Sequence, residues 1–115
     1  MATILVVDDE DLVLPLVSTM LRSAGHRPSD AHNGLEAISL FRSYPDRFDL
    51  VITDMKMPTL DGLQLIKLIR ETRRDMRIIC MSGFTETCPT GVHFLTKPFL
   101  PRQLLEAVEQ TLTPA

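Results

Sequence analysis

Five short apolar segments alternate along the chain with longer amphipathic ones, and this alternation constrains the fold more than any other feature. It is typical of a parallel sheet covered by helices on both faces. The sequence therefore predicts a doubly wound α/β fold in a single layered domain. The expected strands occupy residues 4–7, 27–31, 50–53, 78–81 and 92–96.

The composition of each segment indicates its place in the sheet. Residues 4–7, 50–53 and 78–81 are apolar almost throughout, as central strands buried on both faces are. Residues 27–31 contain Pro28, which has no N–H to donate to a neighbouring strand in a sheet interior. We therefore expect 27–31 at an edge.

Helix starts are marked by capping residues. Asn33 with Glu36, and Asp61 with Gln64, have the spacing of a capping box. A final helix is expected after Pro101, because proline suits a first helical position. The first helix is expected to hold proline within its opening turn and to bury one apolar stripe. That stripe comprises Val13, Leu16, Val17, Met20 and Leu21.

Length and charge exclude several classes of protein. The 115 residues fit one domain, 1–115, and are too few for a second domain of ordinary size. The net charge of −3 offers no broad basic surface, so direct binding to nucleic acid is not expected. No apolar run approaches the roughly 20 residues that a membrane span needs, and no basic leader opens the chain. We therefore expect a cytoplasmic protein that does not bind membranes.

Chemically active residues follow four of the expected strands. Asp8 and Asp9 follow the first, Asp54 the third, Ser82 the fourth and Lys97 the fifth. In doubly wound sheets, ligands bind beyond the carboxyl ends of the strands, so this edge is the first candidate for a site. The alternative interpretation is that these aspartates are polar loop residues and helix caps, which is the usual role of aspartate after a strand.

Crowded carboxylates at this edge would need a counter-charge. Two like charges 4 Å apart repel by about 4 kcal/mol at an effective dielectric constant of 20. Oxygen ligands beside a crevice that is open to water suit a hard divalent ion, and Mg²⁺ (or Mn²⁺) fits best. Lys97 would supply a further positive charge.

Four motifs at the strand ends now point to a family. They are Val-Val-Asp-Asp-Glu at 6–10, Asp-Leu-Val-Ile-Thr-Asp-Met-Lys-Met-Pro at 49–58 with Asp-Gly after it, Met-Ser-Gly at 81–83, and Phe-Leu-Thr-Lys-Pro-Phe at 94–99. In this order, and over essentially the whole chain, they resemble the receiver domains of bacterial two-component response regulators. The resemblance implies a flavodoxin-like, five-stranded parallel sheet with strand order 2-1-3-4-5.

The resemblance also implies a function in phosphorelay signal transduction. Asp54 would be the phosphoacceptor, which takes a phosphoryl group from the phosphohistidine of a histidine kinase or phosphotransfer protein, or from a small donor such as acetyl phosphate. Asp9 would ligate Mg²⁺ directly and Asp8 mainly through water, while Asp54 and the backbone carbonyl of Lys56 would complete the protein's share. Such a chain assists its own phosphorylation but is not a conventional enzyme, and we expect a monomer or weak dimer.

Three further residues receive roles by resemblance. Lys97 and Ser82 would hold phosphoryl oxygens, and the Lys97–Pro98 peptide bond would be cis. Ser82 resembles a switch hydroxyl that moves toward the phosphoryl group and lets an aromatic residue turn inward. Phe94 stands at that aromatic position, although a plain core aromatic is an equal alternative.

The sequence departs from the family between Ser82 and Lys97, where it is about seven residues shorter than usual. We therefore expect the family's fourth helix to be shortened or absent, with a loop or at most one helical turn at residues 83–91. That helix belongs to the family's usual output surface, so docking of partners there is in doubt. The phosphoacceptor site is unaffected.

Three rival interpretations remain to be weighed. A phosphatase of the haloacid dehalogenase type needs a second acid two residues after its nucleophile, where this chain has Lys56. A flavodoxin-like cofactor binder needs a phosphate loop rich in Ser, Thr and Gly, whereas the acids at 8–10 would repel a phosphate. The closer rival is a receiver domain that acts as a phosphorylation-independent interaction module.

Overall fold

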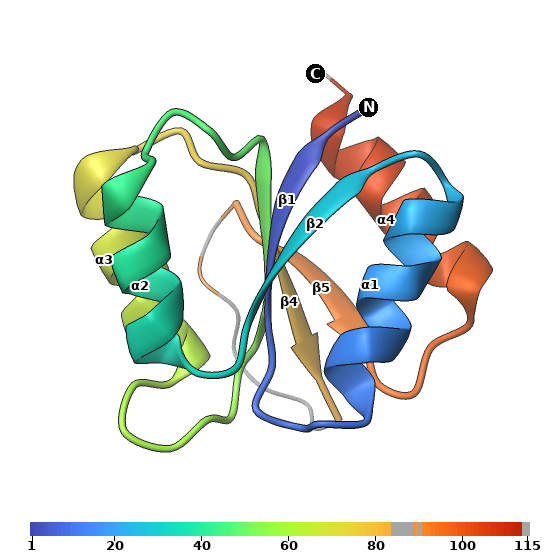
Figure 1. The fold of residues 1–115 in the computed structure, drawn as a ribbon, viewed down its shortest axis with the longest axis horizontal. Helices are drawn as coiled ribbons and strands as arrows, with labels where there is room; N and C mark the ends of the chain where they lie inside the picture. Colours follow the sequence, from blue (N-terminus) through green and yellow to red (C-terminus); the bar gives the residue numbers. More distant parts are fainter. Residues whose placement is uncertain (84–88, 90, 114–115) are drawn as a thin grey trace.

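The computed structural model describes residues 1–83, 89 and 91–113. Figure 1 shows a central sheet with helices on both sides. None of the described helices is long and apolar enough to cross a membrane. In chain order the elements are β1 (Thr3–Val7), α1 (Val13–Ser23), β2 (Arg27–Ala31), α2 (Gly34–Ser43), β3 (Leu50–Asp54), α3 (Gly62–Thr72), β4 (Ile78–Ser82), β5 (His93–Thr96) and α4 (Pro101–Leu112).

The five strands form one sheet in the order β2-β1-β3-β4-β5, and every neighbouring pair is parallel. This confirms the predicted doubly wound, flavodoxin-like fold. The strand that contains Pro28 lies at an edge, as predicted. An edge strand has a neighbour on one side only, so the N–H that proline lacks costs the sheet less there. The other four strands differ from the predicted bounds by one residue at one end.

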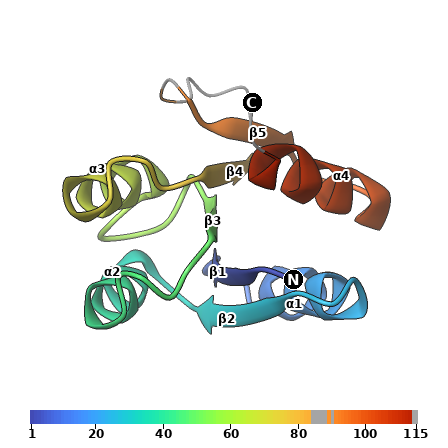
Figure 2. The same cartoon turned by 90° about the horizontal axis from the view of Figure 1, so that it is seen from above.

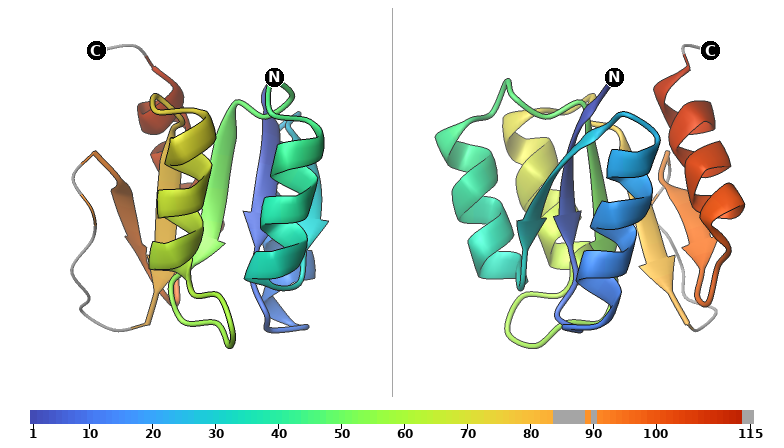
Figure 3. Two further views of the ribbon diagram at one scale, coloured as in Figure 1. Left: turned by 90° about the vertical axis from the view of Figure 1, so that its left-hand side faces the viewer. Right: turned by 45° about the vertical axis from the view of Figure 1, so that its right-hand side comes forward.

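Two layers of helices cover the two faces of the sheet. Seen from above, α2 and α3 lie on one face and α1 and α4 on the other (Figure 2), and Figure 3 shows the two pairs in turn. Alternate residues of β1 divide between the two resulting core clusters: Leu5 and Val7 pack toward α2 and α3, whereas Ile4 and Val6 pack toward α1 and α4. All four are fully buried, which is the reason that these four positions of the strand are apolar.

The buried face of α1 differs from the predicted stripe. Leu14 is 2% exposed, whereas Leu16 is 59% exposed and belongs to the solvent face. The buried positions are Leu14, Val17, Ser18 and Leu21, which have helical spacing. A polar residue therefore stands inside the stripe, where the Ser18 hydroxyl donates to the Asp30 carboxylate. The prediction was right for Val17 and Leu21, and Val13 and Met20 are partly buried against the same core. It was wrong in taking Leu16 instead of Leu14, and it missed Ser18 because it counted apolar residues only.

The predicted capping box is complete at α3 and only half-formed at α2. The Asp61 carboxylate accepts from the backbone N–H of Gln64 at 2.9 Å, and the Gln64 side chain accepts from the Asp61 N–H at 3.0 Å. At α2, the Asn33 side chain accepts from the Glu36 N–H at 2.7 Å. These bonds fix where each helix begins, and the start of α3 adjoins the candidate site.

The connection between β4 and β5 is only partly within the described chain. Four helices occur among the described residues. The loop predicted at 83–91 falls largely on residues 84–88 and 90, which lie outside the described part, so it stays a prediction. The Lys97–Pro98 peptide bond that follows β5 is cis, as the resemblance implied.

Candidate functional site

The register of the sheet brings two aspartates together. Val7 of β1 pairs with Thr53 of β3, so the next residue of each strand, Asp8 and Asp54, lies at the same carboxyl edge. Asp8 is fully buried and Asp54 is 5% exposed. Burial of neighbouring acids is costly unless a positive charge lies close by.

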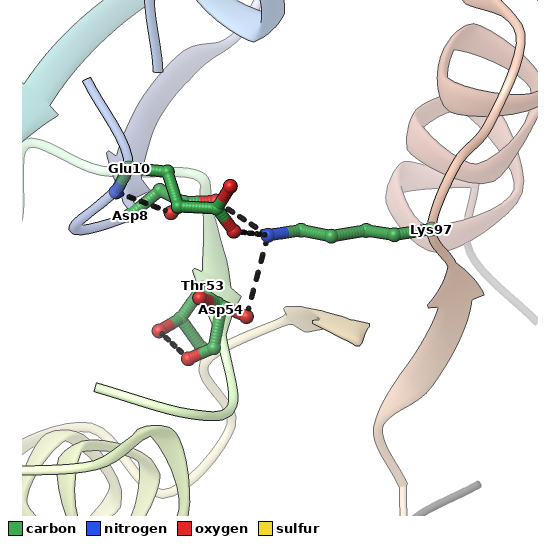
Figure 4. A network of polar contacts seen from close by, with 5 residues as sticks. All are labelled: Asp8, Glu10, Thr53, Asp54 and Lys97. Carbon is green, nitrogen blue, oxygen red and sulfur yellow. Dashed lines mark hydrogen bonds and ion pairs between the residues drawn. The ribbon is translucent and has the colours of Figure 1, made fainter. Parts of the chain in front are cut away.

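Lys97 supplies that charge from the far side of the sheet. It follows β5, and its side chain extends toward the acids of β1 and β3 (Figure 4). The Lys97 Nζ lies 2.8 Å from Asp8 Oδ2, 3.3 Å from Glu10 Oε1 and 3.5 Å from Asp54 Oδ1. One ammonium therefore contacts three carboxylates. Lys97 thus brings a positive charge to this edge of the sheet, as predicted.

The contact with Lys97 compensates the negative charge of Asp54 only in part. Burial, and next the charge of Asp8, raise the pKa of Asp54 from 3.8 to about 6, although the charge and hydrogen bond of Lys97 oppose this. The pKa of Lys97 is also raised: burial lowers it, but its hydrogen bond to Asp8 and the charges of Asp54 and Asp8 outweigh that effect. A further positive charge beside Asp54 would therefore favour its ionised form.

The oxygen atoms at this edge fit a hard divalent ion. Carboxylate oxygens of Asp8, Glu10 and Asp54 all lie within 4.8 Å of one another. Donors of this kind, close together and partly open to water, are what Mg²⁺ prefers. Sequence reasoning placed Glu10 at the strand end but assigned it no role, although it belongs to the same acidic run.

The other predicted ligands are placed less centrally. Asp9 is exposed and lies outside that group of three, and its charge makes the smallest of the named contributions to the raised pKa of Asp54. Lys56 is exposed and stands two residues after Asp54, just beyond the end of β3. The roles of Asp9 and of the Lys56 carbonyl as ligands stay predictions.

Ser82 is brought to the same edge. It ends β4, one residue beyond Met81, which pairs with Asp54. Ser82 is 2% exposed, and its carbonyl accepts from the Lys97 N–H at 2.8 Å, so the two strand ends are tied together. Phe94 is half-buried and packs against the core cluster beneath α2 and α3. Its role in switching stays a prediction.

Gly62 fixes the backbone beneath the site. A Cβ atom at this position would lie 2.5 Å from the Asp54 carbonyl oxygen and 2.8 Å from the Met55 Cα. The Gly62 N–H donates to the Met55 carbonyl at 3.0 Å. The first residue of α3 is therefore packed directly on the residues that present the Asp54 carboxylate, and only glycine fits there.

The fold and this edge together define an α/β domain of the receiver class, with buried aspartates and a lysine at the carboxyl ends of β1, β3 and β5. The family model described as the response regulator receiver domain matches residues 4–109. The chain therefore belongs to the receiver domain family of two-component response regulators. Phosphorylation and Mg²⁺ are general features of this family.

Similar proteins agree with this assignment. The chain is 34% identical to the sensor kinase CckA of Brucella abortus (strain 2308) over 118 residues, which cover 96% of this chain. It is 38% identical over 120 residues, again 96% of this chain, to the DNA-binding transcriptional regulator NtrC of Azospirillum brasilense. These matches span only 12% and 24% of the two relatives.

Solved structures show the same fold. A response regulator receiver domain protein from Clostridium thermocellum superimposes with a TM-score of 0.91 at 28% identity, covering 97% of this chain and 94% of that one. The receiver domain of the hybrid histidine kinase CckA gives a TM-score of 0.88 at 35% identity, with 96% and 99% covered. The shared architecture extends over nearly the whole of each chain.

Proposed function

We propose that this chain is a phosphoacceptor in a phosphorelay and that Asp54 receives the phosphoryl group. The observation that carries the proposal is the nearly buried Asp54 carboxylate, held between Asp8 and Lys97 at the carboxyl edge of the sheet. In the transfer, an Asp54 oxygen forms a bond to phosphorus while the bond from phosphorus to the donor breaks and its electron pair leaves with the donor. The donor is the phosphohistidine of a histidine kinase or phosphotransfer protein, or acetyl phosphate.

The acids of the site are proposed to hold Mg²⁺ (or Mn²⁺) through Asp8, Asp9, Asp54 and the backbone carbonyl of Lys56. When bound, the ion would neutralise negative charge between the carboxylates and the incoming donor. The clustered carboxylate oxygens of Asp8 and Asp54 and the raised pKa of Asp54 support the share of these two residues. Removal of divalent ions is therefore expected to stop phosphorylation.

Lys97 and Ser82 are proposed to hold the transferred group. The Lys97 ammonium lies 3.5 Å from Asp54 and needs only a small movement to reach an oxygen of a phosphoryl group there. The Ser82 hydroxyl, on the neighbouring strand, would donate to another oxygen. A movement of Ser82 toward the phosphoryl group, with Phe94 turning inward, would pass the signal on.

The proposed setting is the cytoplasm, with a histidine kinase or phosphotransfer protein as the donor and another protein as the target. The net charge of −3 supports a protein partner over nucleic acid. The chain would act as a monomer or weak dimer. The chain would itself be phosphorylated in one step and return to its unmodified form in another. It would therefore not be a conventional enzyme.

The proposal is tested by phosphorylation with acetyl phosphate, followed by intact-protein mass spectrometry and phosphate-affinity electrophoresis. We expect one phosphoryl group per chain in the presence of Mg²⁺, and none with EDTA or in Asp54→Asn. Asp46→Asn, which changes an exposed aspartate in a turn, should be labelled like the wild type. A wild-type chain that takes no label, even from histidine kinases of its source, would be a phosphorylation-independent interaction module instead.

A further inference from the structure

The three carboxylates around Lys97 differ in how firmly the fold holds them. The side chain of Asp8 is fully buried and that of Asp54 is 8% exposed, whereas that of Glu10 is 59% exposed. Asp8 and Glu10 meet the ammonium from the β1 side, and Asp54 meets it from the β3 side (Figure 4). The ammonium lies nearer to the two β1-side carboxylates than to Asp54.

We infer that Glu10 is a positioning residue that holds the Lys97 ammonium on the β1 side of the site until a phosphoryl group on Asp54 draws it across. The inference rests on the proposed function. Its geometric basis is the 3.3 Å contact from Glu10 Oε1 to Lys97 Nζ, together with the 2.9 Å hydrogen bond from the Glu10 N–H to Asp8 Oδ1. The backbone of Glu10 is thus fixed while its carboxylate is free to part from Lys97.

The exposure of Glu10 makes the contact releasable. Ion pairs with an exposed partner contribute about 0.2–1 kcal/mol, so loss of this one should change a rate by about 1.5- to 5-fold. A contact of that strength can bias the position of Lys97 without trapping it. The buried Asp8 remains its firm anchor throughout, so removal of Glu10 should leave Lys97 in the site and closer to Asp54.

Two other roles for Glu10 predict different results. If only its negative charge mattered, by repelling the anionic donor, its removal would lower the donor concentration needed for half-maximal rate. If Glu10 were itself a ligand of the divalent ion, its removal would weaken Mg²⁺ binding. The experiment must therefore separate the maximal rate, the half-saturating donor concentration and the affinity for Mg²⁺.

The test compares Glu10→Gln with Asp11→Asn, which removes a neighbouring exposed charge that does not contact Lys97. Phosphorylation by acetyl phosphate is measured at saturating Mg²⁺. We expect Glu10→Gln to raise the maximal rate constant by about 1.5- to 5-fold, with an unchanged half-saturating donor concentration, and Asp11→Asn to match the wild type. A change confined to the half-saturating concentration, or an equal change in both variants, would overturn the inference.

The same substitution in a variant that lacks the lysine shows whether Glu10 acts on the rate through Lys97. In Lys97→Met, the further change Glu10→Gln is expected to alter neither the rate of labelling nor the affinity for beryllofluoride followed by NMR. An effect that persists without Lys97 would refute the positioning role. Mg²⁺ titration of the single variants by NMR completes the set: a loss of affinity in Glu10→Gln more than about fivefold beyond that in Asp11→Asn would identify a ligand instead.

One readout does not depend on phosphorylation at all. The side-chain ¹³C resonances of Lys97, at fixed pH and without Mg²⁺, are expected to shift in Glu10→Gln and to stay unchanged in Asp11→Asn. Failure of the proposed function would be seen as a wild type that takes no label. Failure of this inference would be seen as Lys97 resonances that do not respond to Glu10.

Discussion

The substitution Asp54→Asn should stabilise the folded protein at neutral pH. Asparagine has nearly the shape of the protonated carboxyl group but never carries the buried charge. Burial and the Asp8 carboxylate disfavour that charge, which raises the pKa of Asp54 from 3.8 to about 6. A difference of about 2 units, at 1.36 kcal/mol per unit, corresponds to about 3 kcal/mol at pH 7.5.

The pH dependence follows from the direction of this shift. Between pH 6 and about 4 the native state binds a proton on Asp54 that the unfolded chain does not, so the wild type gains stability relative to the variant as pH falls. The advantage of Asp54→Asn should therefore be full above pH 7, shrink as pH falls through 6 and nearly vanish below 4. Mg²⁺ should also narrow this stability advantage. The variant lacks one carboxylate ligand, so the bound ion stabilises the ionised wild type more than the variant.

The assay is urea unfolding in EDTA, followed by far-ultraviolet circular dichroism at several pH values from 4 to 8. Asp46→Asn serves as the control, because it removes an exposed carboxylate and should leave the free energy of unfolding within about 0.5 kcal/mol of the wild type. An Asp54→Asn variant that is less stable than the wild type at pH 7.5 would refute the argument. So would a gain that does not change with pH.

Three further substitutions, two of them paired with a control variant, test the framework of the fold by the same unfolding measurement. Gly62→Ala should lower the free energy of unfolding by about 1–3 kcal/mol because its methyl would meet backbone. Gly83→Ala, which has no described atom within 4 Å of the added methyl, should leave it unchanged; equal effects would contradict the packing. Asp61→Ala removes the capping box of α3 and should lower the free energy of unfolding by about 1 kcal/mol. An unchanged free energy of unfolding would mean that the cap does not stabilise the fold. Leu14→Ala should lower the free energy of unfolding by about 2–5 kcal/mol and Leu16→Ala should leave it almost unchanged. The reverse order would mean that Leu16, as first predicted, is the buried residue.

The sheet and its reactive edge could be predicted from the sequence because both follow from short-range patterns. Mostly apolar runs such as 50–53 are typical of strands buried on both faces, and a parallel sheet places all its carboxyl ends along one edge. Once β1 and β3 are neighbours, Asp8 and Asp54 must adjoin each other. Lys97 follows by the same rule from the end of β5.

Details that depend on the path of a loop could not be predicted in this way. After β1 the chain turns, and the path of that turn decides which acid contacts Lys97. Glu10 makes this contact, whereas Asp9 is exposed to solvent. No periodicity extends through three residues of a turn, so the sequence left their order of importance open. Ser18 in the buried face of α1 was missed for a related reason, because its hydroxyl is satisfied by Asp30, which lies beside it only in the folded chain.

The electrostatics of the site link its stability to its chemistry. With a pKa near 6, Asp54 is mostly ionised at pH 7.5, as the proposed nucleophile must be, although its surroundings disfavour the charge. Lys97 is shared among three carboxylates and therefore neutralises Asp54 only in part. A fold that compensated Asp54 fully would be more stable but would gain less on binding a cation or a phosphoryl group. The incomplete compensation of Asp54 would thus favour the proposed binding of a cation or a phosphoryl group at this edge.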